Sequence, residues 1–156
     1  VYAEDPQNNF LPDIGILETY IRPQGLGVRV DDGFEEGMQI PIYYDPMIAK
    51  LVTFGKDREE ARQRMLRAIE EYQIKGVKTT LSFCRFTLEH EAFISGKFDT
   101  NFVKHHFKPE YLDQRKEDEE LVAALLATKL VSELSIANTN KSEKALQTSK
   151  WRANRS

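Results

Sequence analysis

The sequence has a single cysteine, no long apolar run and no excess of basic residues. Cys84 is the only cysteine in 156 residues, so neither an intrachain disulfide nor a cysteine-built zinc site is possible. No stretch is long and apolar enough for a transmembrane helix or a signal peptide. The net charge of −3 disfavours a nucleic-acid binder, because such proteins usually have a basic excess. We therefore expect a cytoplasmic protein with no nucleic-acid or membrane partner.

Common catalytic motifs are also missing. The sequence contains no P-loop, no serine nucleophile elbow and no zinc motif. Gly25-Leu26-Gly27 lacks the third glycine of a dinucleotide fingerprint and opens no helix, which favours a plain turn. His105 and His106 are neighbours, and neighbours on a helix point in different directions, so a shared metal ion is disfavoured. Cys84 lies in a stretch typical of a helix interior, where we expect a packed thiol and no nucleophile.

Short extended segments dominate the first 55 residues. Val28-Arg29-Val30-Asp31 alternates apolar and polar side chains, a pattern typical of a half-buried strand. The stretch 14–21 is rich in isoleucine and favours a strand. Pro46 pushes the residue before it into an extended conformation, and 46–54 is interpreted as a mostly buried strand closed by Gly55. Together with a short extended piece at 37–42, these segments predict antiparallel β-structure with short connections.

The hydrophobic period becomes helical after Gly55. Asp57 and Glu60 have capping-box spacing. Apolar residues then recur at helical intervals up to a break at Gly76, at positions Ala61, Met65, Ile69 and Tyr72. A second helix is expected over 80–90, and Thr100-Asn101 is expected to cap a short last helix. The fold class predicted is therefore α+β, an antiparallel sheet covered by helices.

The composition changes past Pro109. An acidic run at 117–120 precedes a leucine-rich stripe, which predicts an amphipathic helix over 117–135. Residues 138–149 are polar with few large apolar side chains, so a flexible tail is expected over 138–156. Trp151 is unusual in such a tail, and we interpret it as a docking residue.

Six short segments occur in the order found in biotin carboxylases. They are Ala3-Glu4-Asp5-Pro6, Asn9-Phe10-Leu11-Pro12, Gly27-Val28-Arg29-Val30-Asp31, Tyr44-Asp45-Pro46-Met47-Ile48-Ala49-Lys50, Asp57-Arg58-Glu59-Glu60-Ala61 and Gly76-Val77-Lys78-Thr79. Over 1–107 the chain resembles the C-terminal domain of the biotin carboxylase unit of acetyl-CoA, propionyl-CoA or pyruvate carboxylases. We therefore expect three parts: this domain at 1–107, a helical extension at 108–137 and the tail at 138–156.

The resemblance implies a parent enzyme with an ATP-grasp fold. Such a ligase uses ATP, Mg²⁺ and bicarbonate to carboxylate biotin on a carrier domain or protein, in acyl-CoA carboxylation that includes fatty acid biosynthesis. The groups that grip phosphate, Mg²⁺ and bicarbonate lie upstream of this stretch in the family. We therefore expect the 156 residues to be a fragment that holds no catalytic residue, binds no cofactor alone and is inactive alone. Implied partners are a second biotin carboxylase protomer, the biotin carrier and a carboxyltransferase subunit.

Four positions take roles from the resemblance. Phe102 corresponds to an apolar residue that contacts adenine, although an aliphatic side chain is expected there, and plain core packing is the alternative. Leu26 and Arg29 correspond to positions at a two-fold dimer interface. Some relatives have an aromatic residue in place of Leu26. Without the resemblance, Arg29 would be interpreted as an ordinary exposed strand residue. Asp45 corresponds to an aspartate that links this interface to the biotin site, or is a turn former.

Two other functions remain open at this point. One is another ATP-grasp ligase, of purine or carbamoyl metabolism, which the order of the segments around Asp45 and Gly76 disfavours. The other is a stand-alone protein-interaction module, which the helical extension and the missing catalytic groups favour. ATP binding by the natural protein would discriminate between an enzyme and such a module.

Overall fold

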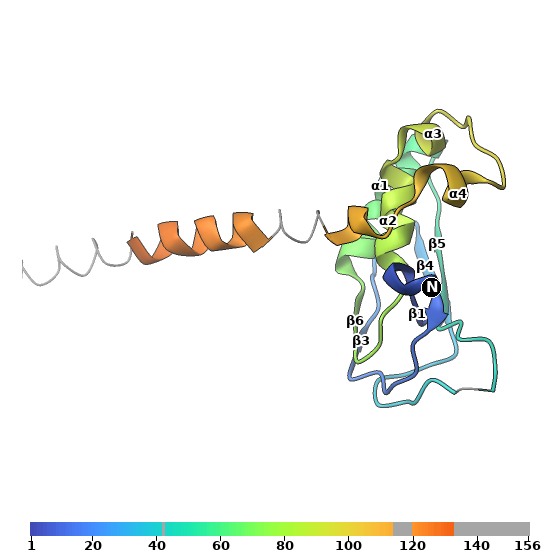
Figure 1. The fold of residues 1–156 in the computed structure, drawn as a ribbon, viewed down its shortest axis with the longest axis vertical. Coiled ribbons are helices and arrows are strands. Elements are labelled where there is room, and N and C mark those ends of the chain that lie inside the picture. The colour runs from blue at the N-terminus through green and yellow to red at the C-terminus, as the bar shows by residue number, and fades with distance from the viewer. Residues whose placement is uncertain (42, 114–119, 133–156) are drawn as a thin grey trace, which may run out of the picture. The chain divides into compact units, whose positions relative to one another are not determined.

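The computed structural model describes residues 1–41, 43–113 and 120–132. The chain divides into two units, residues 1–112 and 113–156, which we describe separately. The first unit contains short strands followed by helices (Figure 1). In chain order its elements are β1 (Glu4–Asp5), the 3₁₀ turn η1 (Pro6–Asn8), β2 (Leu11–Pro12), β3 (Thr19–Ile21), β4 (Val28–Asp32), β5 (Ala49–Thr53), α1 (Arg58–Glu71), β6 (Gln73–Lys75), α2 (Leu81–Glu89), α3 (Glu91–Ile94) and α4 (Phe102–His106).

The strands form three antiparallel ladders of two strands each: β1 with β2, β3 with β6, and β4 with β5. In the longest ladder Val28 pairs with Thr53 and Asp32 with Ala49. Isolated bridges join Tyr2 to Met47 and Ile16 to Gln39. The predicted α+β class with antiparallel pairing is confirmed.

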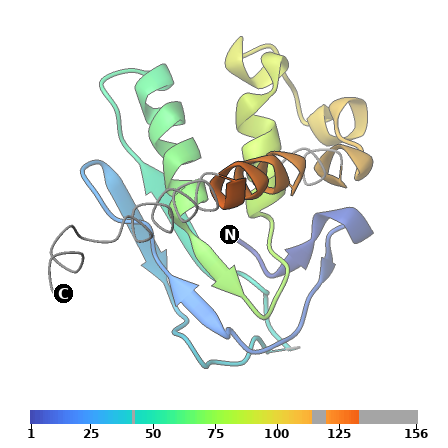
Figure 2. The same ribbon diagram turned by 90° about the vertical axis from the view of Figure 1, so that its left-hand side faces the viewer.

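The helix α1 begins where its sequence signal predicts. The Asp57 side chain accepts a hydrogen bond from the Glu60 backbone N–H at 2.8 Å, which satisfies one of the free donors at the helix start. The Glu60 carboxylate accepts from the Lys56 N–H at 2.6 Å, one residue earlier than in a standard capping box. α1 packs on β4 and β5 and lies beside α2 (Figure 2).

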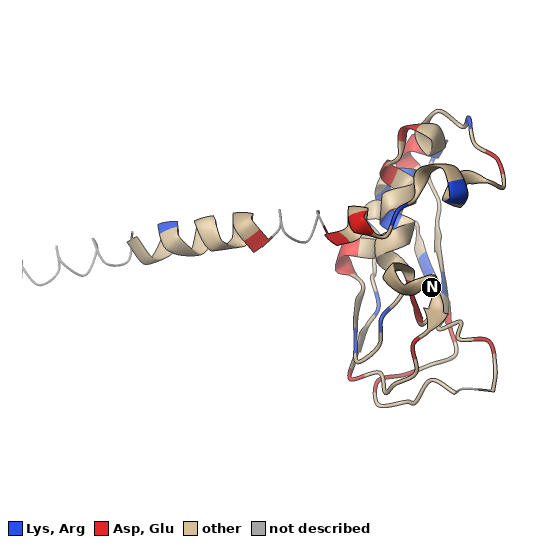
Figure 3. Ribbon diagram, in the orientation of Figure 1, with Lys and Arg blue, Asp and Glu red and all other residues tan. Residues whose placement is uncertain are grey.

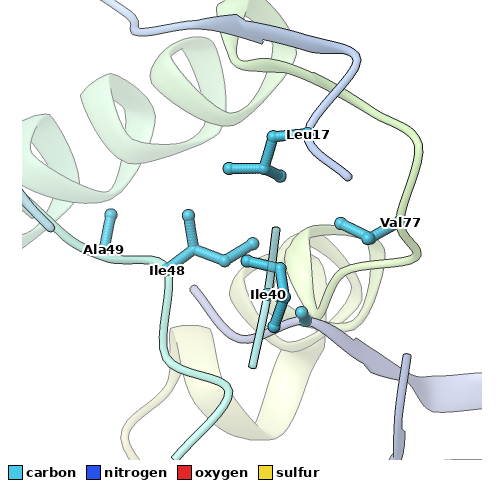
Figure 4. Close-up of a cluster of buried hydrophobic side chains, with 6 residues drawn as sticks. Leu17, Ile40, Ile48, Ala49 and Val77 are labelled. Atoms are coloured by element: carbon cyan, nitrogen blue, oxygen red, sulfur yellow. The ribbon is translucent and has the colours of Figure 1, made fainter. Parts of the chain in front are cut away.

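A small aliphatic core lies under the ladders. Its buried side chains converge on one another from segments far apart in the sequence (Figure 4). They are Ala3, Leu17, Ile40, Ile48, Ala49 and Val77. Tyr20, Val30, Phe34 and Ile74 pack around this set, which we call the aliphatic core. Basic and acidic residues are interspersed along the surrounding ribbon (Figure 3).

The strand β6 is absent from the sequence prediction, which continued the helix to Gly76. The helix instead ends at Glu71, and Ile74 pairs with Tyr20 of β3 and packs against the aliphatic core. This long-range pairing overrides a helical pattern that is locally uninterrupted. Gly76 follows at φ +95°, which only glycine adopts readily.

The prediction of a mostly buried strand at 46–54 is wrong. The strand β5 is shorter and alternates, with Lys50 and Val52 exposed, because α1 covers only one face of the β4–β5 ladder. Of the stretch 14–21 only Thr19–Ile21 is a strand, and 37–42 contributes one bridge at Gln39.

The C-terminal predictions have mixed outcomes. α2 and α4 form as expected, but Asn101 makes no side-chain cap bond; its N–H donates to the Asp99 carboxylate at 2.8 Å. Residues 120–132 are helical with every residue exposed, and the rest of 117–135 and Trp151 lie outside the described residues. Within the described residues no helix has the length and apolarity needed to cross a membrane.

Candidate functional site

Aromatic rings from the N-terminal segment, α2, α3, α4 and the stretches that follow α3 and α4 pack together at the helical end of the first unit. We call this set the aromatic cluster: Phe10, Phe83, Phe86, His90, Phe93, Phe98, Phe102, His106, Phe107 and Tyr111. Phe83 lies at one end, with ring centroids of Phe10 and Phe107 each 4.9 Å away in edge-to-face geometry. Arg58 at the start of α1 lies over the ring of Phe93 at the other end. The cluster fixes α2, α3 and α4 relative to one another.

Phe102 lies inside this cluster. Its side chain is only 7% exposed, and its ring contacts His106 at 5.1 Å and His90 at 5.2 Å between centroids. It also borders an open hollow lined by Gly96, Lys97, Phe98, Asp99, His105 and His106. Phe98 lines the same hollow and is 48% exposed. The geometry therefore fits both roles raised for Phe102, a core residue and a wall of a site.

Aromatic, acidic and basic side chains line the hollow together. Phe98 and Phe102 supply rings, while Lys97, Asp99 and the two histidines supply polar and chargeable groups. The Asp99 carboxylate accepts from the Asn101 N–H, and this bond lowers its pKa. Among the described residues no cluster of three or more His, Cys, Asp or Glu could hold a metal ion.

Arg29 lies on the exposed side of the β4–β5 ladder, and Leu26 lies in the turn just before it. Leu26 is 88% exposed, and the bond from the Phe54 N–H to the Gly27 carbonyl holds Phe54 beside this turn. Arg29 is cross-strand neighbour to Val52 and pairs with Asp31 at 3.2 Å. We call the exposed residues of the ladder and of its adjoining ends the ladder face: Leu26, Arg29, Asp31, Lys50, Val52 and Phe54.

Asp45 lies away from that face, in the exposed loop before β5. The neighbouring rings of Tyr43 and Tyr44 are also exposed. The next residue, Pro46, accepts a backbone hydrogen bond from the Ala3 N–H at 2.8 Å, so the loop is anchored beside the N-terminal segment.

An ion pair that sequence reasoning missed joins two of the six family segments. The Lys78 ammonium bonds the Asp5 carboxylate at 2.6 Å, and this contact lowers the Asp5 pKa and raises that of Lys78. Asp5 also accepts from the Gln7 N–H, and Asp13 accepts from the Lys78 N–H at 2.5 Å. The sequence indicates only that the two segments carry charges of opposite sign, and nothing in it pairs positions 5 and 78.

The apolar surroundings of Cys84 determine the pKa of its thiol. It lines an apolar cavity of about 290 Å³ between α1, α2 and β5, together with Met65, Leu81 and Leu88. Burial raises the pKa of its thiol, so the thiolate needed for nucleophilic attack is disfavoured. The prediction of a packed thiol agrees with this setting.

The comparison with known families identifies the fold. The family model described as "Biotin carboxylase C-terminal domain" matches residues 1–105. The chain belongs to this family. Biotin carboxylase 1 of Bacillus subtilis is 50% identical over 104 residues, which cover 67% of this chain and 23% of that protein. A pyruvate carboxylase subunit from Methanothermobacter thermautotrophicus is 43% identical over 135 residues, covering 85% of this chain and 28% of that protein.

A solved structure agrees with this assignment. The biotin carboxylase domain dimer of the Hydrogenobacter thermophilus 2-oxoglutarate carboxylase superposes with a TM-score of 0.66 at 41% identity, covering 67% of this chain and 23% of that one. That structure is a complex with MgADP, ADP and bicarbonate. This biotin carboxylase C-terminal domain therefore spans about a quarter of the length of these three relatives.

Proposed function

We propose that this chain works as the C-terminal domain of a biotin carboxylase, an ATP-dependent ligase that transfers a carboxyl group from bicarbonate to biotin on a carrier. The observation that carries the proposal is the match to the biotin carboxylase C-terminal domain over 1–105, together with 50% identity to Biotin carboxylase 1. Because that relative is about four times longer than the matched part, the ATP, Mg²⁺ and biotin groups would be held mainly by other segments of the parent protein.

The contribution of this domain is a wall of the nucleotide site. The ring-lined hollow beside Phe102 supports this role, since it offers aromatic faces and polar edges at the end of α4. Phe98 is the more exposed ring and is expected to share the contact. Asp45, in the loop before β5, is proposed to link the dimer surface to the biotin site.

The natural protein that contains this chain tests the proposal directly. We expect ADP release that depends on biotin and bicarbonate from that longer protein, and none from residues 1–156 alone. ADP release that does not depend on biotin would favour another ATP-grasp ligase. A natural gene product that is no longer than this chain and does not hydrolyse ATP would favour the interaction module.

The ladder face is the proposed contact with a second protomer. The solved relative is a domain dimer, and an interface with two-fold symmetry brings the same patch of both protomers together. Arg29 and Asp31 lie side by side on that patch, so each can pair with its opposite in the other protomer, while Leu26 and Phe54 supply apolar area.

Dimer formation by the parent protein tests this surface. Leu26→Asp should weaken dimerisation at least about tenfold in sedimentation, because it places an unpaired charge in an apolar contact. Leu11→Asp is the matched control, since Leu11 is an exposed leucine outside the ladder face. Equal dimerisation of both variants and the wild type would refute the assignment.

The helix at 120–132 is the proposed contact with other parts of the carboxylase, its carrier or its carboxyltransferase. An alignment of 135 residues with the pyruvate carboxylase relative cannot fit within 1–105, so the likeness extends into this region. Leu121, Leu125 and Leu130 are all exposed on the helix. Deleting 108–156 should weaken assembly with the partner proteins in gel filtration; unchanged assembly would contradict this role. A cytoplasmic location remains part of the proposal.

A further inference from the structure

Two histidines and a buried phenylalanine meet where α2, α3 and α4 come together. The His90 ring lies edge-to-face on Phe102, with 5.2 Å between centroids and 87° between planes. It also lies 4.6 Å from the ring of His106 and 5.6 Å from that of Phe86. Because the two rings are in contact, a change at His90 is expected to affect the position of Phe102.

His90 also caps α3. Its Nδ1 accepts a hydrogen bond from the Ala92 backbone N–H at 3.1 Å. A ring nitrogen that accepts a hydrogen bond carries no proton, so this contact exists only in the neutral imidazole with its proton on Nε2. Protonating Nδ1 would set an N–H against an N–H and break the cap.

We propose that neutral His90 is a positioning residue for Phe102, and that its protonation loosens the wall that Phe102 forms at the hollow. The part of this inference that concerns the nucleotide rests on the proposed function. The part that concerns the cap and the rings rests only on the geometry around His90. Imidazole changes charge between about pH 5 and 8, so the loosening falls in the range that cells experience.

The elements packed around His90 carry charged and titratable groups of both signs. They include Glu59 and Arg62 of α1, Arg85 and Glu89 of α2, Glu91 of α3, Lys97 and Asp99 of the following loop, and Lys104, His105 and His106 of α4; His105, His106 and Tyr111 line one hollow with His90. The hydrogen bond from the Asn101 N–H, with a smaller contribution from the nearby His105 and His106, holds the pKa of Asp99 below its usual range. The His106 ring is the titratable group in ring contact with His90, at 4.6 Å between centroids.

Amide hydrogen exchange on the 156-residue chain tests the cap. Between about pH 8 and 5 the protection factor of the Ala92 amide should fall about fivefold, the worth of one helix cap. The Phe102 ring resonances should shift with the same midpoint as the His90 ring. In His90→Asn the amide oxygen accepts the same bond at every pH, so Ala92 protection should change less than about twofold.

His105→Asn is the comparison variant, because His105 lines the same hollow but accepts no hydrogen bond from Ala92. The fall in Ala92 protection should persist in it, with a midpoint that is free to differ because His105 contacts His106. Constant Ala92 protection in the wild type, or an unchanged fall in His90→Asn, would overturn the inference. So would a Phe102 shift that follows a different midpoint.

The nucleotide part is tested in the longer carboxylase. The KM for ATP should rise several-fold on acidification with the His90 midpoint, and this rise should vanish in His90→Asn while the pH dependence of kcat remains. If the KM for ATP shows no such rise while the fall in Ala92 protection is observed, the nucleotide role of Phe102 is refuted and the cap assignment still holds. Loss of all biotin-dependent activity in the wild-type parent would instead refute the proposed function.

Discussion

The β half and the helical end of the first unit are held together by different means. In the β half the backbone segments approach one another closely over the aliphatic core, and Gly15, Gly55 and Gly76 have no room for a side chain. At the helical end the contacts are between aromatic side chains of α2, α3 and α4, and Gly96 lies in open space. At these close approaches the β half is therefore expected to tolerate change less than the helical end, which can adjust around its rings.

Substitution of glycine should show the largest effect. A Cβ at position 76 would overlap the carbonyl oxygen of Ile16, and the residue has φ +95°. Gly76→Ala should cost about 3 kcal/mol of unfolding free energy or more, measured by urea denaturation. Gly96→Ala, at φ +73° with nothing nearby, should cost about 1 kcal/mol, and Gly33→Ala should be nearly neutral. Similar costs at 76 and 96 would contradict the comparison.

Truncation of the aliphatic core comes next. Leu17 is 0% exposed, and Leu17→Ala should lower the unfolding free energy by about 3 kcal/mol through the cavity it leaves. Its neighbour Ile16 is 53% exposed, so Ile16→Ala serves as the matched control and should change stability by less than about 1 kcal/mol. Thermal unfolding followed by circular dichroism measures both. Equal losses would show that the core is placed wrongly.

Removing rings from the aromatic cluster should lower the unfolding free energy less than the core truncation does, and the losses from two contacting rings should not be additive. Phe83→Leu and Phe107→Leu each remove one ring from an edge-to-face pair 4.9 Å apart. Each should cost about 1–2 kcal/mol, and the double variant should show a coupling of about 1 kcal/mol in urea denaturation. Phe54→Leu, on an exposed ring outside the cluster, is the control. Strict additivity of the two ring variants would mean that the rings do not stabilise one another.

The smallest effect concerns pH. The Lys78 contact lowers the Asp5 pKa, so Asp5 binds its proton less readily in the folded chain than in the unfolded one. Its contribution is therefore fully present above the unfolded value of about 3.9, and is lost as the pH falls through the lower folded pKa. Asp5→Asn should flatten this part of the acid unfolding curve. Asp31→Asn, at an exposed ion pair, is the control and should leave the curve unchanged.

The sequence predicts an element where the signal lies within one segment, and it fails where the element depends on contacts between distant segments. The start of α1 follows from Asp57 and Glu60, and β4 from the alternation over 28–31, because each signal is contained within one segment. The strand β6 depends on β3, more than fifty positions earlier, so the local helical pattern gave the wrong answer there.

The candidate site shows the same limit. The resemblance assigned Leu26 and Arg29 to a dimer interface and Phe102 to an adenine contact or to the core; the structure shows Leu26 and Arg29 exposed and Phe102 buried beside a hollow. The contact of His90 with Phe102 and His106 was not predicted, because nothing in the sequence indicates how α2 and α4 turn toward each other. Whether these residues serve a nucleotide and a dimer stays a prediction.

The most direct test of the account is an exchange of domains with a working relative. The matched region of Bacillus subtilis Biotin carboxylase 1, 50% identical, can be replaced by residues 1–105 of this chain, and ADP release measured with and without biotin. We expect biotin-dependent release within about tenfold of the relative, and none when the region is deleted. A folded chimera with no biotin-dependent release would contradict the claim that this chain is a biotin carboxylase domain in function as well as in fold.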